Sequence, residues 1–131
     1  MRPHSTHKKE IGALGERLAA QYLESKGFGI LGRNYRKPWG EIDIIAEKGG
    51  VVRFVEVKTV TRESLPDVSR ENHDYRPEEL VHEYKLLKIM KTAEYYMNEK
   101  GGDREFQVDV VGVFLDMRRR VARCRLFEQV L

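Results

Sequence analysis

The chain has little of several features that mark other classes of protein. Its 131 residues contain a single cysteine, Cys124. One cysteine excludes an internal disulfide and a cysteine-rich zinc site, and such a chain suits a reducing cytoplasm. No apolar run approaches the roughly 20 residues of a membrane span, and no apolar signal-peptide core follows the polar start of the chain. We therefore expect a cytoplasmic protein without a membrane partner.

Neither sign of charge dominates. The chain has 24 lysine and arginine residues against 21 aspartate and glutamate residues, a formal net charge of +3. This balance permits a polyanionic partner but does not require one. The length suits one domain with a genuine core. We predict a flexible basic tail over residues 1–8 and a single domain over residues 9–131.

The apolar pattern predicts two helices and five strands. Apolar residues recur at helical spacing over residues 9–26 and, after Pro77, to about residue 100. The residues of the second helix expected to face the core are Leu80, Leu86, Leu87, Met90, Ala93 and Met97. Strands are predicted over residues 29–35, 41–47, 51–58, 106–115 and 121–127. This order indicates an α/β fold with a mixed sheet flanked by helices, in which the strand over 106–115 is covered on both faces.

Asp43, Glu56 and Lys58 lie on the two strands that a turn at residues 48–50 joins. Its two glycines favour a tight antiparallel turn because they adopt positive φ. With these glycines as the loop, paired residue numbers sum to 99, so Asp43 faces Glu56. Directly opposed residues have Cβ atoms roughly 4.5–5.5 Å apart. Glu56 and Lys58 leave the same face of their strand, so two carboxylates and one ammonium group are predicted to converge.

Two opposed carboxylates indicate a cation site. Unit charges about 5 Å apart repel by roughly 3 kcal/mol at an effective dielectric of 20, and a divalent cation such as Mg²⁺ would offset this repulsion. Lys58 would neutralise the pair in part but has no atom that ligates a metal. The alternative is that Glu56-Val57-Lys58 is only a solvated strand face. A β-bulge would also move Asp43 off the shared face.

Two further segments flank the hairpin. Glu16 lies at the border of the apolar stripe of the first helix, from which its carboxylate could reach the sheet. An ordinary boundary glutamate is the alternative on periodicity alone. Residues 61–75 form a long polar stretch directly after the strand of Lys58. A loop of this length is usually functional or disordered, and from its position it could close over the carboxylates.

Several motifs together resemble one family. They are Gly15-Glu16, Arg33-Asn34-Tyr35-Arg36, the stretch from Gly40 to Ala46, Phe54-Val55-Glu56-Val57-Lys58, Pro77, Lys85 and Asp109-Val110-Val111. This set resembles the bacterial YraN-like family, described as predicted endonucleases related to Holliday-junction resolvases, in the PD-(D/E)XK or restriction-endonuclease-like superfamily. The likeness covers about residues 11–115. Ile42 replaces the superfamily's proline, and Val60 stands where the family tends to carry a basic residue.

The resemblance implies a restriction-endonuclease-like αβββαβ core and a metal-dependent phosphodiester hydrolase. Asp43 and Glu56 would bind Mg²⁺ or Mn²⁺, with the backbone carbonyl of Val57 as a further ligand. Glu16 would help to hold the metal or a water molecule. The metal would activate this water and stabilise charge on the phosphate. Lys58 would orient the water or neutralise the transition state.

Basic and aromatic residues near the hairpin are candidates for nucleic-acid contacts. They are Arg33, Tyr35, Arg36, Lys37 and Trp39 before or within the hairpin, and Lys85, Lys88 and Lys91 on the second helix. The basic side chains would position phosphates without reading sequence. Tyr35 and Trp39 could stack on unpaired bases. The alternatives are a hydrophobic lid at the sheet edge for Trp39 and a solvated helix face for Lys88 and Lys91.

The residues and the resemblance favour a nuclease that acts on DNA, with branched or flapped DNA as one candidate substrate and the actual substrate left open. The alternative is a nucleic-acid-binding or partner-recruiting module that keeps this fold without hydrolysis. Cleavage of both strands at a junction would require a homodimer. The sequence leaves the dimer open, as it leaves open DNA against RNA. Asp109 is interpreted as a structural carboxylate that holds a basic residue.

Overall fold

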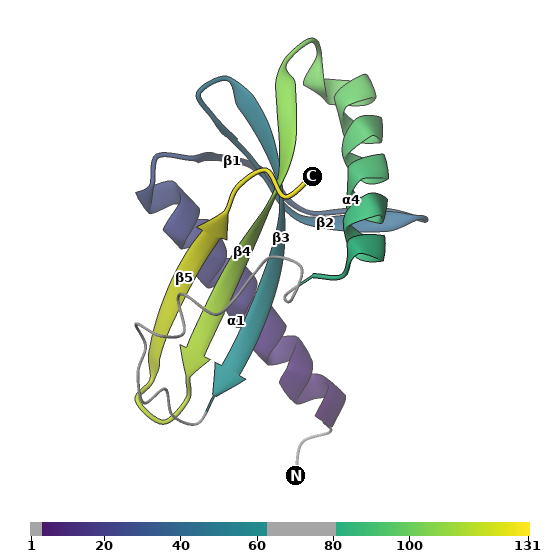
Figure 1. The fold of residues 1–131 in the computed structure, drawn as a ribbon. Helices are drawn as coiled ribbons and strands as arrows, with labels where there is room; N and C mark the ends of the chain where they lie inside the picture. Colours follow the sequence, from purple (N-terminus) through teal and green to yellow (C-terminus); the bar gives the residue numbers. More distant parts are fainter. Residues whose placement is uncertain (1–3, 63–80) are drawn as a thin grey trace.

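The computed structural model describes residues 4–62 and 81–131, with helices on both sides of one sheet (Figure 1). Its elements are α1 (His4–Ser25), β1 (Gly29–Lys37), β2 (Gly40–Lys48), β3 (Val51–Arg62), α4 (Glu83–Tyr96), the π-helical turn η1 (Met97–Gly101), β4 (Glu105–Asp116) and β5 (Val121–Phe127). The order of helix, three strands, helix and two strands is the predicted one. The α/β class is confirmed by a five-stranded mixed sheet flanked by helices.

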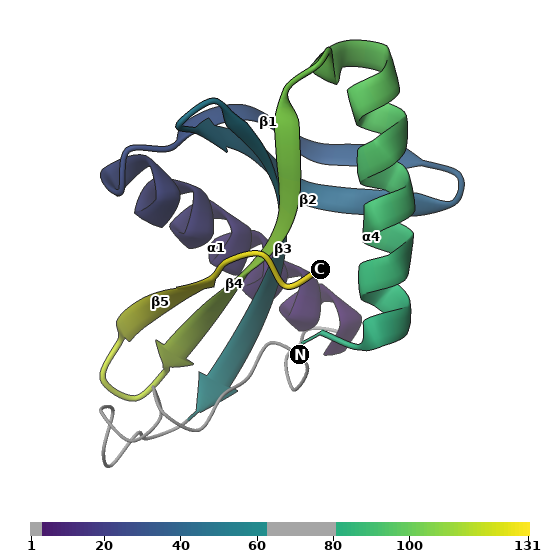
Figure 2. The same ribbon diagram turned by 45° about the horizontal axis from the view of Figure 1, so that its top comes forward.

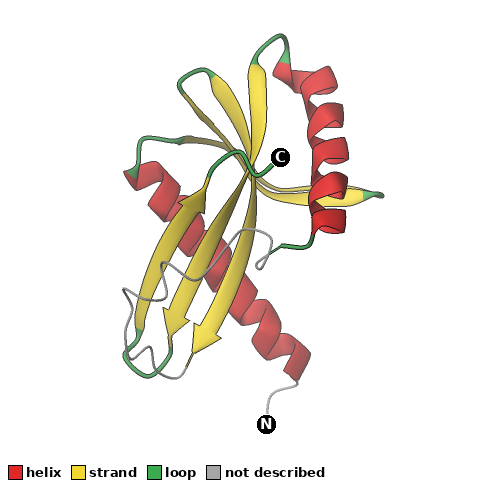
Figure 3. Cartoon of the chain, in the orientation of Figure 1, coloured by secondary structure: helices red, strands yellow, loops and turns green. Residues whose placement is uncertain are grey.

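The sheet has the strand order β1-β2-β3-β4-β5. Its neighbours are antiparallel except β3 and β4, which are parallel. Parallel neighbours need a crossover connection, and α4 lies in this connection. It covers the face of the sheet opposite to α1 (Figure 3).

Each face of the sheet packs its own apolar core. The core beneath α4 includes Phe54, Leu86 and Ile89, and the core beneath α1 includes Leu23 and Val55, all at most 5% exposed. The segment 108–116 of β4 is buried throughout. This confirms the prediction that the strand is covered on both faces.

The β2–β3 hairpin has the predicted symmetric turn. Gly49 and Gly50 both adopt positive φ, 62° and 79°, as a two-residue hairpin loop requires. The five pairs from Lys48↔Val51 to Ile44↔Val55 all sum to 99. The pairing ends there, because the β1–β2 hairpin turns away from β3 and runs beneath α4 (Figure 2). The two strands therefore diverge at the predicted carboxylates.

Both helices begin at residues other than those predicted. α1 begins at His4, so residues 4–8, predicted as a tail, are helical. They contain no apolar residue that could reveal the helical period. α4 begins at Glu83, because Val81 is buried in the core and His82 is extended, with φ −66° and ψ 146°. The predicted start at Pro77 lies outside the described residues.

One residue of the predicted apolar face of α4 is on the wrong side. Leu87 is 56% exposed, since the buried stripe follows Leu86, Ile89 and Ala93. Leu80, predicted for the same face, falls in the segment 63–80, of which the structure gives no description. The same holds for most of the predicted 61–75 loop, of which the first two residues belong to β3. None of the described helices is long and apolar enough to cross a membrane.

Candidate functional site

Asp43 lies where β2 leaves β3, and its side chain spans the gap. A carboxylate oxygen of Asp43 accepts a hydrogen bond from the backbone N–H of Val57 at 2.8 Å. A side chain thus takes the place of the backbone carbonyl that a continued ladder would have supplied to this donor. This bond holds Asp43 beside Glu56, the neighbour of Val57 on β3.

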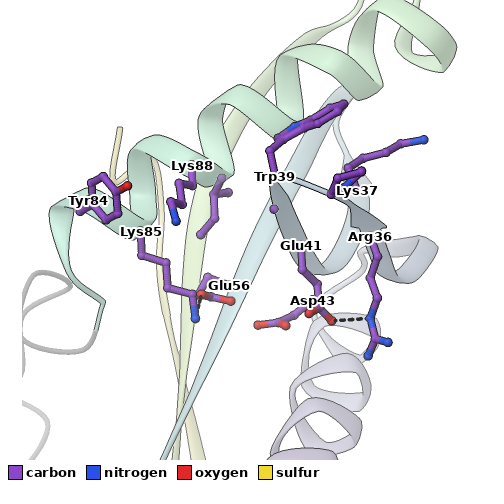
Figure 4. Close-up of a pocket in the computed structure, with 12 residues that line it drawn as sticks. Arg36, Lys37, Trp39, Glu41, Asp43, Glu56, Tyr84, Lys85 and Lys88 are labelled. Carbon is purple, nitrogen blue, oxygen red and sulfur yellow. Dashed lines mark hydrogen bonds and ion pairs between the residues drawn. The ribbon is translucent and has the colours of Figure 1, made fainter.

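Glu56 is buried, with one cation against it. Its side chain is 3% exposed, and a carboxylate oxygen lies 2.7 Å from the ammonium nitrogen of Lys85 on α4 (Figure 4). Burial, then a hydrogen bond with Asp43 and the charge of Asp43, raise the pKa of Glu56 to about 8, although Lys85 acts in the opposite direction. Burial lowers the pKa of Lys85, but its hydrogen bond with Glu56 and the charge of Glu56 outweigh this, so the net shift is upward.

Glu16 adds a third carboxylate from α1. Burial, the charge of Asp43 and a hydrogen bond with Asp43 raise the pKa of Glu16 to about 7, whereas the charge of Arg33 lowers it. Glu16 comes this close because its neighbour Gly15 has no side chain. A Cβ atom at Gly15 would overlap the hydroxyl oxygen of Thr59 on β3. Carboxylates from α1, β2 and β3 are therefore adjacent, as the sequence predicted for Asp43 and Glu56.

Two hollows meet at these carboxylates. The hollow that we call the hairpin hollow has a volume of about 570 Å³ and is lined by Arg36, Lys37, Pro38, Trp39, Gly40, Glu41, Asp43, Glu56, Tyr84, Lys85, Lys88 and Ile89. The helix hollow has a volume of about 650 Å³ and is lined by Lys8, Lys9, Ile11, Gly12, Ala13, Glu16, Asp43, Val57, Lys58, Thr59, Thr61 and Lys85. Asp43 and Lys85 line both hollows, so a ligand in either one would reach the same carboxylate and the same lysine.

The cation at Glu56 is a different residue from the one expected. Lys58 was predicted to neutralise the carboxylates, but Lys85 occupies that position. Lys58 is exposed and lines the helix hollow together with Glu16 and Val57. Lys58 and Val57 thus remain next to the carboxylates.

The predicted basic contacts lie around the hairpin hollow, and several have partners within the chain. Arg36 forms an ion pair with Glu41 at 3.2 Å. The ammonium group of Lys37 lies 4.9 Å from the ring centre of Tyr95, and that of Lys88 lies 4.7 Å from the ring centre of Tyr84. Arg33 is exposed and close enough to Glu16 to lower its pKa.

The two aromatic candidates differ in position. Trp39 lines the hairpin hollow and is 36% exposed. It packs edge-to-face on Tyr95, with ring centres 5.1 Å apart, which agrees in part with a lid at the sheet edge. Tyr35 lines neither hollow. Its ring packs on Tyr96, its hydroxyl donates to Glu99 at 3.2 Å, and burial, followed by Glu99, raises its pKa to about 12.

Sequence analysis did not assign two polar side chains that line the hairpin hollow, those of Tyr84 and Glu41. Tyr84 is 71% exposed and stands beside Lys88. Glu41 pairs with Arg36 across β1 and β2. Tyr84 adjoins Lys85, which was assigned, so sequence adjacency was the available signal there. Glu41 lies inside the Gly40–Ala46 motif, of which only Asp43 was assigned to the site.

Glu16, Asp43 and Glu56 bring several carboxylate oxygens close together. Glu16 and Glu56 have pKa values of about 7 and about 8, so near neutral pH these two groups hold protons for part of the time instead of carrying two full charges. Within residues 4–62 and 81–131, no three side chains of His, Cys, Asp or Glu are gathered closely enough to hold a metal ion. A cation would have to replace both these protons and the contact between Glu56 and Lys85.

Residues 15–113 match the model of a family described as "Uncharacterised protein family UPF0102". The chain belongs to this family. A UPF0102 protein of Dictyoglomus turgidum is 40% identical over 117 residues, covering 88% of this chain and 91% of the relative. One of Moorella thermoacetica is 38% identical over 116 residues, 88% and 89% of the two chains. One of Campylobacter fetus is 40% identical over 101 residues, 77% and 80%.

Membership of UPF0102 confirms the resemblance to YraN-like proteins at the level of the family. The matched range begins at Gly15 and contains all three carboxylates of the site, together with Lys58 and Lys85. The site therefore lies inside the part of the chain by which the family is defined.

Proposed function

We propose that the protein is a metal-dependent nuclease that hydrolyses phosphodiester bonds in DNA. The observation that carries this proposal is the convergence of Glu16, Asp43 and Glu56 from three separate elements at the place where the two hollows meet. The order of the elements, with Asp43 on one hairpin strand and Glu56-Val57-Lys58 on the next, supports a restriction-endonuclease-like core.

The donor set fits a hard divalent cation. Mg²⁺ and Mn²⁺ prefer carboxylate, carbonyl and water oxygens. Burial, together with the nearby carboxylate of Asp43, raises the pKa values of Glu16 and Glu56, and a bound cation would offset both effects. Asp43 and Glu56 would hold the cation, with the carbonyl of Val57 and the carboxylate of Glu16 as further oxygen donors. The bound cation supplies Lewis acidity, which activates water and stabilises charge on phosphate.

The remaining polar residues have separate roles in this proposal. Lys58, exposed in the helix hollow, orients the attacking water and neutralises charge that develops on the phosphate. Lys85, which pairs with Glu56 at 2.7 Å, would be free to contact a phosphate oxygen where Glu56 holds a cation. Arg33, Arg36, Lys37 and Lys88 contact the neighbouring phosphates of the strand.

One observation favours a second function. Lys85 already neutralises the charge of Glu56 in the metal-free protein. The carboxylates therefore have less need of a metal ion, which suits a module that binds nucleic acid or recruits a partner without hydrolysis. The two functions differ in whether the carboxylates bind a metal.

Calorimetric titration of Mn²⁺ into the purified protein separates them. We expect one binding site, with higher affinity at about pH 8.5 than at about pH 7, because bound protons compete with the metal. Glu56→Gln should abolish this binding. Glu41→Gln is the matched control, since Glu41 lines the same hollow but pairs with Arg36, and it should bind as the unaltered protein does. Binding that Glu56→Gln retains would contradict the metal site.

Hydrolysis is tested with labelled single-stranded, duplex, flapped and four-way DNA in Mn²⁺. Lys58→Ala should bind metal normally and cleave none of the substrates that the unaltered protein cleaves. Cleavage by this variant would contradict the role of Lys58. Metal binding without cleavage of any substrate in the panel would leave the metal site standing and contradict DNA hydrolysis.

A further inference from the structure

We propose that the hairpin hollow binds an unpaired nucleotide of the DNA strand, with its base stacked on Trp39. This inference deepens the proposed function, on which it rests, because it names the form of DNA that the site accepts. The strand would be single at the position next to the carboxylates, as in a flap, a gap or a frayed end.

The walls of the hollow have the chemistry of a nucleotide site. Trp39 and Tyr84 are 36% and 71% exposed and lie on either side of Glu56 in the view of Figure 4. Three ammonium groups, those of Lys37, Lys85 and Lys88, line the same hollow. Aromatic rings with interspersed cations are how proteins hold single strands, since every base has a face that stacks and every nucleotide has a phosphate. A volume of about 570 Å³ falls in the range of roughly 300–1,000 Å³ that is usual for small-molecule pockets.

The position of the hollow selects the substrate. Asp43 and Glu56 form part of its lining, so a nucleotide held there places its own or an adjacent phosphate at the carboxylates. A base within a duplex is stacked on both sides and presents no free face to an aromatic ring. Only an unpaired base can therefore use Trp39.

Trp39 also has contacts within the chain that a stacking role must accommodate. Its ring packs edge-to-face on Tyr95 at 5.1 Å, and the ammonium group of Lys91 lies 5.9 Å from its centre. Edge-to-face packing fixes the orientation of the ring without covering all of it, and 36% of Trp39 stays exposed. A ring held in this orientation can stack on a base. If Trp39 served only to cover the sheet edge, its fluorescence would not change when a base is present.

The chain offers a direct probe, because Trp39 is its single tryptophan. Tryptophan fluorescence is measured in EDTA, without metal or hydrolysis, against an oligonucleotide of about 12 nucleotides, a length within the usual single-strand site size. We expect strong quenching by the single strand and by a gapped duplex. A blunt duplex and an abasic sugar-phosphate strand of equal charge should quench little. Equal quenching by the abasic strand, or none by any strand, would overturn the inference.

Variants give an independent measurement by anisotropy of a labelled single strand. Trp39→Leu should weaken binding by about 5- to 150-fold, and Trp39→Phe should retain most of the affinity. Tyr84→Ala, at the more exposed ring, is a second test that disturbs little packing and should also weaken binding. Affinities that neither Trp39→Leu nor Tyr84→Ala changes would contradict the site.

These results are separate from those that test the nuclease. Base-dependent quenching in a protein that binds no metal would leave the nucleotide site standing and refute hydrolysis. Metal-dependent cleavage without base-dependent quenching would do the reverse.

Discussion

Glu56 carries a charge in an environment that opposes it. Its side chain is 3% exposed, its neighbour Asp43 is another carboxylate, and its cation is the partly exposed Lys85. Desolvation and like charge both favour the protonated form. The group has therefore been placed where it takes up a proton, or a stronger cation, near neutral pH.

The stability of the metal-free protein should fall as the pH rises. Glu16 and Glu56 have folded-state pKa values of about 7 and about 8, above the ordinary value of 4.5. Between these limits the folded state binds more protons than the unfolded state, so stability is present at about pH 5 and is lost towards about pH 8. Each such proton contributes a slope of at most about 1.4 kcal/mol per pH unit. Urea unfolding at a series of pH values measures this.

Glu56→Gln should flatten the pH dependence, because glutamine resembles the protonated carboxyl and does not titrate. At about pH 8 the variant should be as stable as the unaltered protein or more stable. Glu41→Gln should change the slope far less, because the charge of Glu41 is only a minor cause of the raised pKa of Glu16. A variant of Glu56 that is clearly less stable at this pH would show that the charged pair with Lys85 is structural.

At the residue scale, the sequence was sufficient to bring Asp43 and Glu56 together but not to identify their cation. Register could be counted outward from the two glycines of the turn, and the count holds as far as Ile44↔Val55. Lys85 comes from the crossover helix, whose rotation over the sheet depends on which stripe packs into the core. The spacing of residues within the helix does not determine this rotation. Lys58 was therefore predicted as the cation at Glu56, because it is near Glu56 in the sequence.

At the scale of elements, the site depends on how closely α1 approaches β3. Gly15 is buried, and a Cβ atom there would overlap the hydroxyl oxygen of Thr59. One turn earlier on the same helix, Gly12 has no atom within 4 Å of such a Cβ. Of these two glycines, only Gly15 is needed for the close approach of α1 to β3 that brings Glu16 to Asp43.

Alanine at these glycines should have opposite effects. Gly15→Ala should force α1 away from β3 and destabilise the protein by about 1–3 kcal/mol, with weaker Mn²⁺ binding because Glu16 is displaced. Gly12→Ala should stabilise it by about 0.5–1 kcal/mol, since glycine costs this much inside a helix, and leave binding unchanged. Thermal unfolding and calorimetry measure both. Equal effects of the two substitutions would mean that the close approach is unimportant.

Which elements form was largely predictable, and where they begin was less so. Alternating β-branched residues and the glycine turn predict the hairpin, and the doubly apolar strand predicts its coverage by both helices. Residues 4–8 contain no apolar residue, so their place in α1 left no periodic signal. The divergence of β2 from β3 beyond Ile44↔Val55 was not predicted either, because the alternation of apolar residues continues through the point of separation.

At the scale of the whole molecule, the two faces of the sheet each bury an ionic group, with opposite chemistry. On the face of α1, Asp109 accepts hydrogen bonds from Gln107 and from the backbone N–H of Gln129, both at 2.8 Å. Arg53 lies 3.5 Å from its other oxygen and 2.9 Å from Glu128. The contact with Arg53 confirms that Asp109 lies against a basic residue, and its purely structural role stays a prediction. Asp109 is surrounded by donors, whereas Glu56 on the face of α4 has another carboxylate as its neighbour.

This contrast predicts that Asp109 stabilises the fold and takes no part in the site. Asp109→Ala removes the acceptor of Gln107 and Gln129 and leaves Arg53, whose side chain is 12% exposed, with Glu128 as its remaining partner. Loss of one partner of a buried ion pair costs about 3–5 kcal/mol, and urea unfolding should show a loss of this size. Glu105→Ala, which removes an exposed carboxylate from the same strand, should change stability by less than about 0.5 kcal/mol. Mn²⁺ affinity of the folded Asp109→Ala protein should be unaltered, because the charge removed lies across the sheet from Glu56. A variant that keeps its stability but loses metal binding would place Asp109 in the functional site, and the division between a binding face and a structural face would be wrong.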